Sequence, residues 1–133
     1  MTHTDLIARL QAADGPSREL DAEIWLATTP GATRKKWGYT HLASGRWCEI
    51  DETRDATHRL ILVPTYTDSL DAAVSLVPND LYYLIGRGRS HPDEPLFAAQ
   101  VLDGADVVGE AEHDANAPIA LVIAALLARG ATP

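Results

Sequence analysis

The segment from Asn116 to Gly130 predicts a short helix with apolar residues on almost every side. Asn116 is a typical N-cap, Pro118 suits the first turn, and Arg129 followed by Gly130 ends the helix. The large apolar residues between these limits are Ile119, Leu121, Val122, Ile123, Leu126 and Leu127. Because a helix without a polar face must be covered on most sides, we expect the rest of the chain to pack around this one.

Three more helices are predicted by capping residues and by apolar residues spaced three and four apart. Thr4 is a suitable N-cap for a helix over 5–13, and Ser17 begins a second helix over 17–27. A third helix follows the capping residues at 67–69 and ends at Pro78. The chain therefore opens with two short helices and places another before its second half.

Strand-like segments fill the region between the third helix and the last. They cover 81–86, 96–102 and 106–113, and Asp103-Gly104 predicts a tight turn between the second and the third. We therefore expect an α+β fold in which a three-stranded antiparallel sheet packs against the helices at 68–77 and 117–129, an arrangement like an α-β-α sandwich.

Residues 31–63 form an insert without helical periodicity. Trp37, Tyr39 and His41 alternate with other residues, which indicates either a hairpin turning near 43–45 or an irregular loop. The apolar run over 60–63 predicts a buried strand or an extended lead-in to the next helix. We expect the insert and the first two helices to cover the apolar surface that remains.

Length and composition favour one globular domain over residues 1–133. Apolar residues make up 46% and charged residues 23% of the 133 residues, as in ordinary globular proteins. A single cysteine, Cys48, excludes an internal disulfide, and neither an apolar run of membrane-spanning length nor a signal-like start is present. These features predict a cytoplasmic protein that does not enter the membrane.

Three segments make the chain similar to the phage ABA sandwich domain family, which comprises small phage and prophage proteins. They are Gly15–Ile24, Tyr66–Pro78 and the alanine- and leucine-rich Ala117–Arg129. The resemblance implies helices packed against a three-stranded antiparallel sheet, a phage origin and a bacterial cytoplasm, but no established activity. The insert at 31–63 departs from compact members of the family, so a particular function is expected there.

Charge is distributed unevenly along the chain. The window 31–48 holds four basic residues and no acidic one, a charge of +4, whereas the rest has 7 basic against 19 acidic residues, a charge of −12. An acidic remainder disfavours a long nucleic acid, which needs a wide basic surface. A compact anionic ligand that contacts one patch is compatible with this distribution.

The basic window also carries the aromatic residues that stacking on a base requires. Its candidate ligand residues are Arg34, Lys35, Lys36, Trp37, Tyr39, His41, Arg46 and Trp47, and a glycine-flanked loop adds Arg87 and Arg89. The alternative interpretation is structural: Trp37, Tyr39 and Trp47 pack beneath an exposed insert, and the loop at 86–91 is an ordinary hairpin connection.

No catalytic or metal-binding pattern accompanies these residues. The five histidines lie 17 or more residues apart, and no nucleophile elbow is present. The acidic groups at 110–114 and 51–55 match no calcium-loop motif, and solvated charge explains them better. We therefore expect no catalysis, no cofactor and no metal.

Two functions follow as hypotheses. The first is a phage accessory protein that sequesters a small anionic ligand, most concretely a nucleotide immune signal. The alternative is an interaction module that docks on a host or phage protein through the insert, with aromatic anchors. In both cases we expect a homo-oligomer, with the strand at 106–113 as an exposed edge that pairs with another copy.

Overall fold

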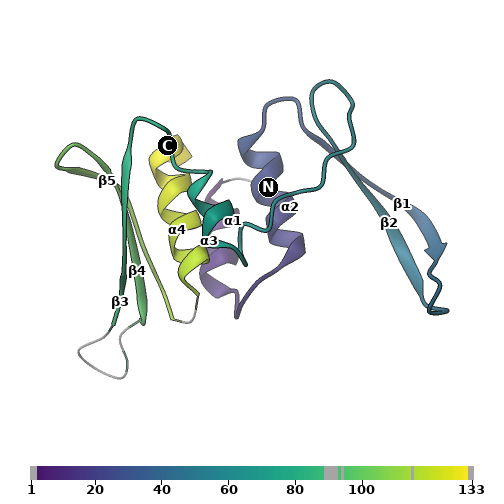
Figure 1. Cartoon of the computed structure of the whole chain (residues 1–133), viewed down its shortest axis with the longest axis horizontal. Helices are drawn as coiled ribbons and strands as arrows, with labels where there is room; N and C mark the ends of the chain where they lie inside the picture. The colour runs from purple at the N-terminus through teal and green to yellow at the C-terminus, as the bar shows by residue number, and fades with distance from the viewer. Residues whose placement is uncertain (1–2, 89–92, 94, 115, 132–133) are drawn as a thin grey trace.

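A computed structural model describes residues 3–88, 93, 95–114 and 116–131 of the chain. The predicted α+β class and its antiparallel sheet of three strands are confirmed. Along the longest axis the layers run from this sheet through the helices to a separate two-stranded hairpin (Figure 1). In chain order the elements are α1 (His3–Ala12), α2 (Arg18–Thr28), β1 (Thr33–His41), β2 (Trp47–Arg54), α3 (Leu70–Val74), β3 (Tyr82–Arg87), β4 (Phe97–Asp103), β5 (Asp106–His113), α4 (Ala117–Leu126) and a π-helical turn, η1 (Leu127–Ala131).

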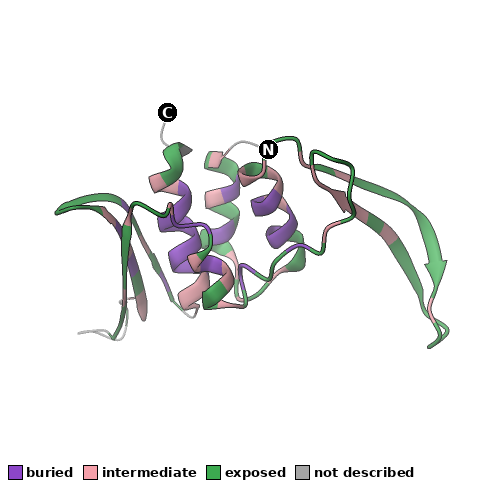
Figure 2. Ribbon diagram, turned by 45° about the horizontal axis from the view of Figure 1, so that its top comes forward, coloured by how far each residue is buried: buried purple, intermediate pink, exposed green. Residues whose placement is uncertain are grey.

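Helix α4 lies in the middle of the core, as its apolar sequence requires. Every residue from Ile119 to Leu126 is buried, with the sheet on one side and α1 and α3 on the other (Figure 1). The predicted N-cap is confirmed, since the side-chain oxygen of Asn116 accepts a hydrogen bond from the Ile119 N–H at 2.8 Å. The purple helical faces in Figure 2 mark this core.

The strands β3, β4 and β5 form an antiparallel meander in that order. Ala99 and Val101 are buried on the face that packs on α4, as is Gly109 of β5. A Cβ atom at position 109 would overlap the carbonyl oxygen of Ala124, so only glycine permits this approach of strand and helix. An α-β-α sandwich has helices on both faces of its sheet, whereas the helices described here cover one face.

The predicted third helix is shorter and sits elsewhere than expected. Ser69 caps α3 by accepting from the Ala72 N–H, but the α-helix ends at Val74 and the chain continues in turns to Pro78. This segment packs chiefly against α4, not on the sheet. The reason is its narrow apolar face: Ala73, Leu76 and Val77 are buried, and they fill the space beside α4.

The insert forms the β1–β2 hairpin, and its turn lies at 43–45 as predicted. Gly45 has a φ of 89°, the left-handed conformation that a three-residue hairpin loop requires. The hairpin extends from the α2 side of the molecule and is mostly exposed (Figures 1 and 2). The expectation that the insert 31–63 covers apolar surface holds only at its ends: Val63 belongs to the core and Ala32 and Ile61 pack against it, whereas none of the described residues 33–54 does.

The segment that leads from the hairpin to α3 is extended. Leu60 and Leu62 are exposed, and only Val63 of this run is buried, so the predicted lead-in is confirmed and the alternative of a buried strand is wrong. Arg18 of α2 holds the segment by donating to the carbonyl oxygen of Val63 at 2.8 Å. Among the residues that the structure describes, no helix has the length and hydropathy that crossing a membrane requires.

Candidate functional site

Arg34, a predicted ligand residue, is the anchor that joins the hairpin to α2. Its guanidinium lies 2.7 Å from Glu19 and 3.0 Å from Glu23, both on α2, and 2.8 Å from Asp51 on β2. The contact with Glu19 is bidentate, and only 9% of the Arg34 side chain is exposed. Three carboxylates therefore occupy the donors that an anionic ligand would need.

The proton affinities of this cluster follow from the same contacts. Hydrogen bonds from Arg34 hold the pKa of Glu19 at about 2, below its ordinary value of 4.5, and burial opposes the shift. Arg34 also lowers the pKa of Asp51. In turn, hydrogen bonds to Asp51 and Glu19 raise the pKa of Arg34. All three groups are therefore charged at neutral pH.

The other cations of the basic window differ in their surroundings. Lys36 lies 3.1 Å from Glu19 and 3.9 Å from Glu49. Lys35 and Arg46 are exposed, and within the described part of the chain neither side chain makes a hydrogen bond or ion pair. Two of the four cations in the window thus remain accessible to a partner.

The basic window is not a basic patch in space. Strand pairing sets Lys35 opposite Glu52 and Lys36 opposite Asp51, and α2 adds Glu19 and Glu23. Sequence reasoning missed these acidic partners. The cross-strand pairs follow from a hairpin that turns at 43–45, so they could have been predicted. Nothing in the sequence indicates that α2 lies against this hairpin.

The three aromatic residues of the window are exposed. Trp37 is 47% exposed, Tyr39 67% and Trp47 66%. The interpretation that they pack beneath the insert is therefore wrong. Large apolar side chains that gather on a protruding element are unusual on a monomer surface and mark a contact site.

We define the hairpin tip as residues 37–48. A bulge at Trp37-Gly38 shifts the register, so that Tyr39 lies opposite Glu49 and His41 opposite Trp47. Directly opposed residues share a face of an antiparallel pair, and Glu49 is two residues from Asp51. Tyr39, His41 and Trp47 thus lie on the face that carries Asp51 and turns toward α2.

Histidine and tryptophan pack together within the tip. The rings of His41 and Trp47 have centroids 5.0 Å apart, and the His41 Nε2 lies 2.9 Å from the carbonyl oxygen of Gly45. These contacts fix the turn and hold the Trp47 ring in place. The tip is a preorganised surface with Arg46 at its end.

The second predicted group of ligand residues lies far from the first. Arg87 ends β3, at the opposite end of the molecule from the hairpin (Figure 1). Arg89 lies outside the described residues. The structure therefore does not bring Arg87 together with the cations of the hairpin.

Acidic and sulfur-containing groups do not assemble into a metal site among the described residues. Glu110 and Glu112 are exposed on β5, and Asp114 follows that strand. Asp51 is bound by Arg34, and Glu52 lies 3.3 Å from Arg54. Cys48 is exposed and free.

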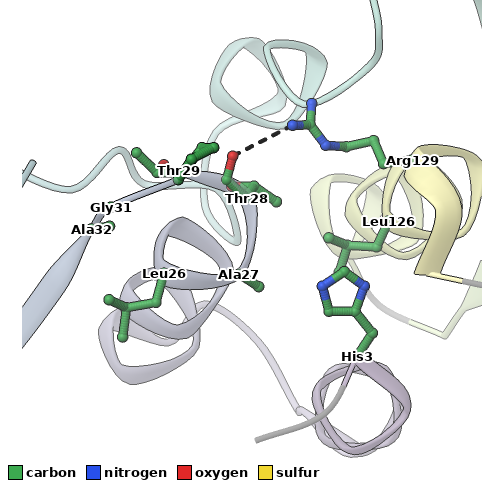
Figure 3. A pocket seen from close by; sticks show the side chains of 10 residues that line it. His3, Leu26, Ala27, Thr28, Thr29, Gly31, Ala32, Leu126 and Arg129 are labelled. Atoms are coloured by element: carbon green, nitrogen blue, oxygen red, sulfur yellow. Dashed lines mark hydrogen bonds between the residues drawn. The ribbon is translucent and has the colours of Figure 1, made fainter. Parts of the chain in front are cut away.

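A pocket of about 400 Å³ lies where the ends of α1, α2 and α4 approach one another (Figure 3). Arg129 and His3 line it together with Leu126. The guanidinium of Arg129 donates to the carbonyl oxygens of Leu76 at 3.1 Å and Thr28 at 3.4 Å. Because Arg129, in η1 directly after α4, binds the segment that follows α3 and the end of α2, we interpret the pocket as a junction between helices. None of the residues predicted for the ligand site lines it.

No family model, curated protein or solved structure matches the chain. The resemblance to the phage ABA sandwich domain family therefore stays a prediction.

Proposed function

We propose that the protein is an interaction module that docks on another protein through the hairpin tip. The observation that carries the proposal is the exposure of Trp37, Tyr39 and Trp47 on a hairpin held at its base by the Arg34 ion pairs. The docking requires no catalysis, cofactor or metal. As part of the same proposal we expect it to take place in a bacterial cytoplasm, which agrees with the single free Cys48.

The chemistry of the tip suits protein recognition. Tryptophan, tyrosine and arginine dominate the residues that carry binding energy in protein interfaces, and each such residue contributes about 2 kcal/mol or more. A contact between His41 and Trp47 limits the side-chain freedom that binding would remove. Arg46 and Lys35 lie beside the aromatic residues, where charged residues set specificity and orientation.

The proposal is tested by capture from a bacterial lysate treated with nuclease and phosphatase. The full chain and its Trp47→Ala variant are immobilised, and retained proteins are quantified by mass spectrometry. We expect a stoichiometric protein partner whose retention falls at least about 30-fold with Trp47→Ala, which corresponds to 2 kcal/mol.

Leu62→Ala is the matched control, because Leu62 is 90% exposed but lies outside the tip. It should retain the partner as the unchanged chain does. If the two variants and the unchanged chain retain the same proteins in the same amounts, docking of the tip on a different protein is refuted.

Sequestration of a small anionic ligand remains a second candidate, favoured by the exposed Lys35 and Arg46 beside Trp47. Its case is weaker because Arg34 and Lys36 are already paired with carboxylates. Calorimetry against a panel of cyclic and linear nucleotides tests it. Heat that disappears with Arg46→Ala would support this function, and no heat at micromolar protein would reject it.

A further inference from the structure

The three-stranded sheet presents a second exposed surface, on the face opposite α4. Because Ala99 and Val101 are buried against α4, the residues that alternate with them along β4 lie on the other face. Strand pairing adds Tyr82 opposite Leu102, Leu84 opposite Gln100, and Val107 opposite Leu102. We call this surface the open face; its apolar side chains are Tyr82, Leu84, Leu102 and Val107.

The open face is apolar at one end and acidic at the other. Tyr82 is 69% exposed, Leu84 59% and Val107 47%. Glu110 and Glu112 lie on the same face, opposite Gln100 and Ala98 respectively. Among the described residues of β3–β5 the only cation is Arg87, which lies opposite Phe97 and therefore on the α4 face.

The hairpin tip has complementary properties. It contains three exposed aromatic residues, the cation Arg46 and no acidic residue. The open face offers exposed apolar side chains next to two carboxylates. An apolar contact between the two surfaces, flanked by an ion pair of Arg46 with Glu110 or Glu112, would cover the exposed apolar side chains of both and match their charges.

The two surfaces cannot meet within one molecule. The sheet and the hairpin lie at opposite ends of the molecule, with the helices between them (Figures 1 and 2). We propose that the hairpin tip of one copy of this chain packs on the open face of a second copy. This inference rests on the proposed function, and it names another copy of the chain as the partner of the tip.

Such a contact is head-to-tail, because it joins two different surfaces. It leaves one tip and one open face free in every dimer, so association continues to larger species unless a ring closes. A two-stranded tip that packs on the face of a three-stranded sheet forms a small interface. Interfaces that bury roughly 1,200 Å² or less are typical of weak association. Association should therefore depend on concentration and grow beyond the dimer.

Sedimentation velocity of the full chain over a range of concentrations tests the inference. We expect the unchanged chain to form dimers and larger species, and the single variants Trp47→Ala and Leu84→Lys each to associate at least tenfold more weakly. Leu62→Lys, at an exposed leucine outside both surfaces, should associate as the unchanged chain does. Circular dichroism establishes that each variant is folded, and Val107→Lys replaces Leu84→Lys if the latter unfolds.

Mixing the two defective variants separates head-to-tail association from every symmetric alternative. Trp47→Ala keeps an intact open face and Leu84→Lys keeps an intact tip, so an equimolar mixture should give a one-to-one dimer and nothing larger. Association that survives both substitutions would assign self-association to another surface, such as the exposed edge of β5, and overturn the inference. A chain that stays monomeric at all concentrations would also overturn it, whereas loss of a captured partner with Trp47→Ala would leave the proposed function standing.

Discussion

At the scale of single residues, one buried carboxylate joins the first half of the chain to the second. Asp21 is 1% exposed, and its Oδ1 accepts hydrogen bonds from the N–H and the hydroxyl of Thr67, both at 2.8 Å. Its Oδ2 lies 2.9 Å from Arg18. The carbonyl of Thr67 accepts from the side chain of Asn116. These residues lie within or directly beside the three segments that carry the family resemblance, so those segments have a structural role.

We predict that Asp21→Ala lowers the free energy of unfolding by about 2–4 kcal/mol. The substitution leaves the buried N–H of Thr67 without an acceptor and its hydroxyl with only the carbonyl oxygen of Ser17, at 3.2 Å. An unpaired buried donor costs more than the hydrogen bond itself contributes. Urea denaturation measures the change. Asp21→Asn keeps an acceptor oxygen for Thr67 and should lose clearly less; equal losses in the two variants would contradict this account.

A second residue-scale prediction concerns two glycines in the same sheet. Gly109→Ala should destabilise the protein by about 2–3 kcal/mol, because the new methyl group overlaps the carbonyl oxygen of Ala124 and forces β5 and α4 apart. Gly86→Ala is the matched control, since a Cβ atom there meets nothing within 4 Å and the backbone is extended. Thermal unfolding should show a lower Tm for Gly109→Ala and an unchanged or slightly higher Tm for Gly86→Ala; equal effects would mean that close packing at Gly109 is unimportant.

At the scale of elements, local signals predicted the strands of the sheet and three helix caps, whereas Thr4, the expected N-cap of the first helix, lies inside α1. Ser17 and Ser69 cap α2 and α3 as expected, since an N-cap depends on hydrogen bonds over three residues. The place of the hairpin was not predictable in the same way. It is set by Arg34 and carboxylates 11 to 17 residues away along the chain, on two different elements.

The charge of the predicted site illustrates the same limit. Residues 31–48 form a basic window when charge is counted residue by residue, but pairing of β1 with β2 and contact with α2 bring acidic residues against it. The aromatic residues could be singled out from the sequence, because their alternation is local. Their exposure depends on where the hairpin projects, which is a property of the whole fold.

An element-scale prediction follows from the lowered pKa of Glu19. Because this pKa is about 2 in the folded protein and 4.5 without its partners, the contact of hairpin and α2 is fully stabilised above about pH 4.5 and weakens as the pH falls toward 2. Asp51, whose pKa is also lowered, acts in the same direction. Carboxyl NMR titration should place the Glu19 midpoint near 2.

Arg34→Met provides the control for this titration. Without the guanidinium, the pKa of Glu19 should rise toward its ordinary value, with Lys36 still acting to lower it, and the acid-induced change in the hairpin signals should move upward with it. A midpoint near 4.5 in the unchanged chain would show that the ion pairs do not hold the hairpin.

At the scale of the whole molecule, the core and the candidate site are separate. The core lies between the sheet and the helices α1–α4, and the described residues 33–54 contribute nothing to it. The apolar surface of α4 dictates the arrangement of the core, because the sheet and the other helices must cover it. The hairpin is free of that requirement, which is why it carries exposed aromatic residues without loss of the fold.

This separation predicts two levels of stability in one chain. A two-stranded hairpin is marginally stable by itself, and this one is joined to the rest mainly through the ion pairs of Arg34 and Lys36. Its amides should therefore exchange with solvent through local opening, with protection at least about 100-fold lower than that of α4. Hydrogen exchange followed by NMR in dilute protein, where self-association is absent, measures both.

Arg34→Met should lower the protection of β1 and β2 further and leave α4 unchanged. Equal protection of hairpin and α4 would mean that the hairpin opens only when the whole molecule unfolds, and that it is part of the cooperative core after all.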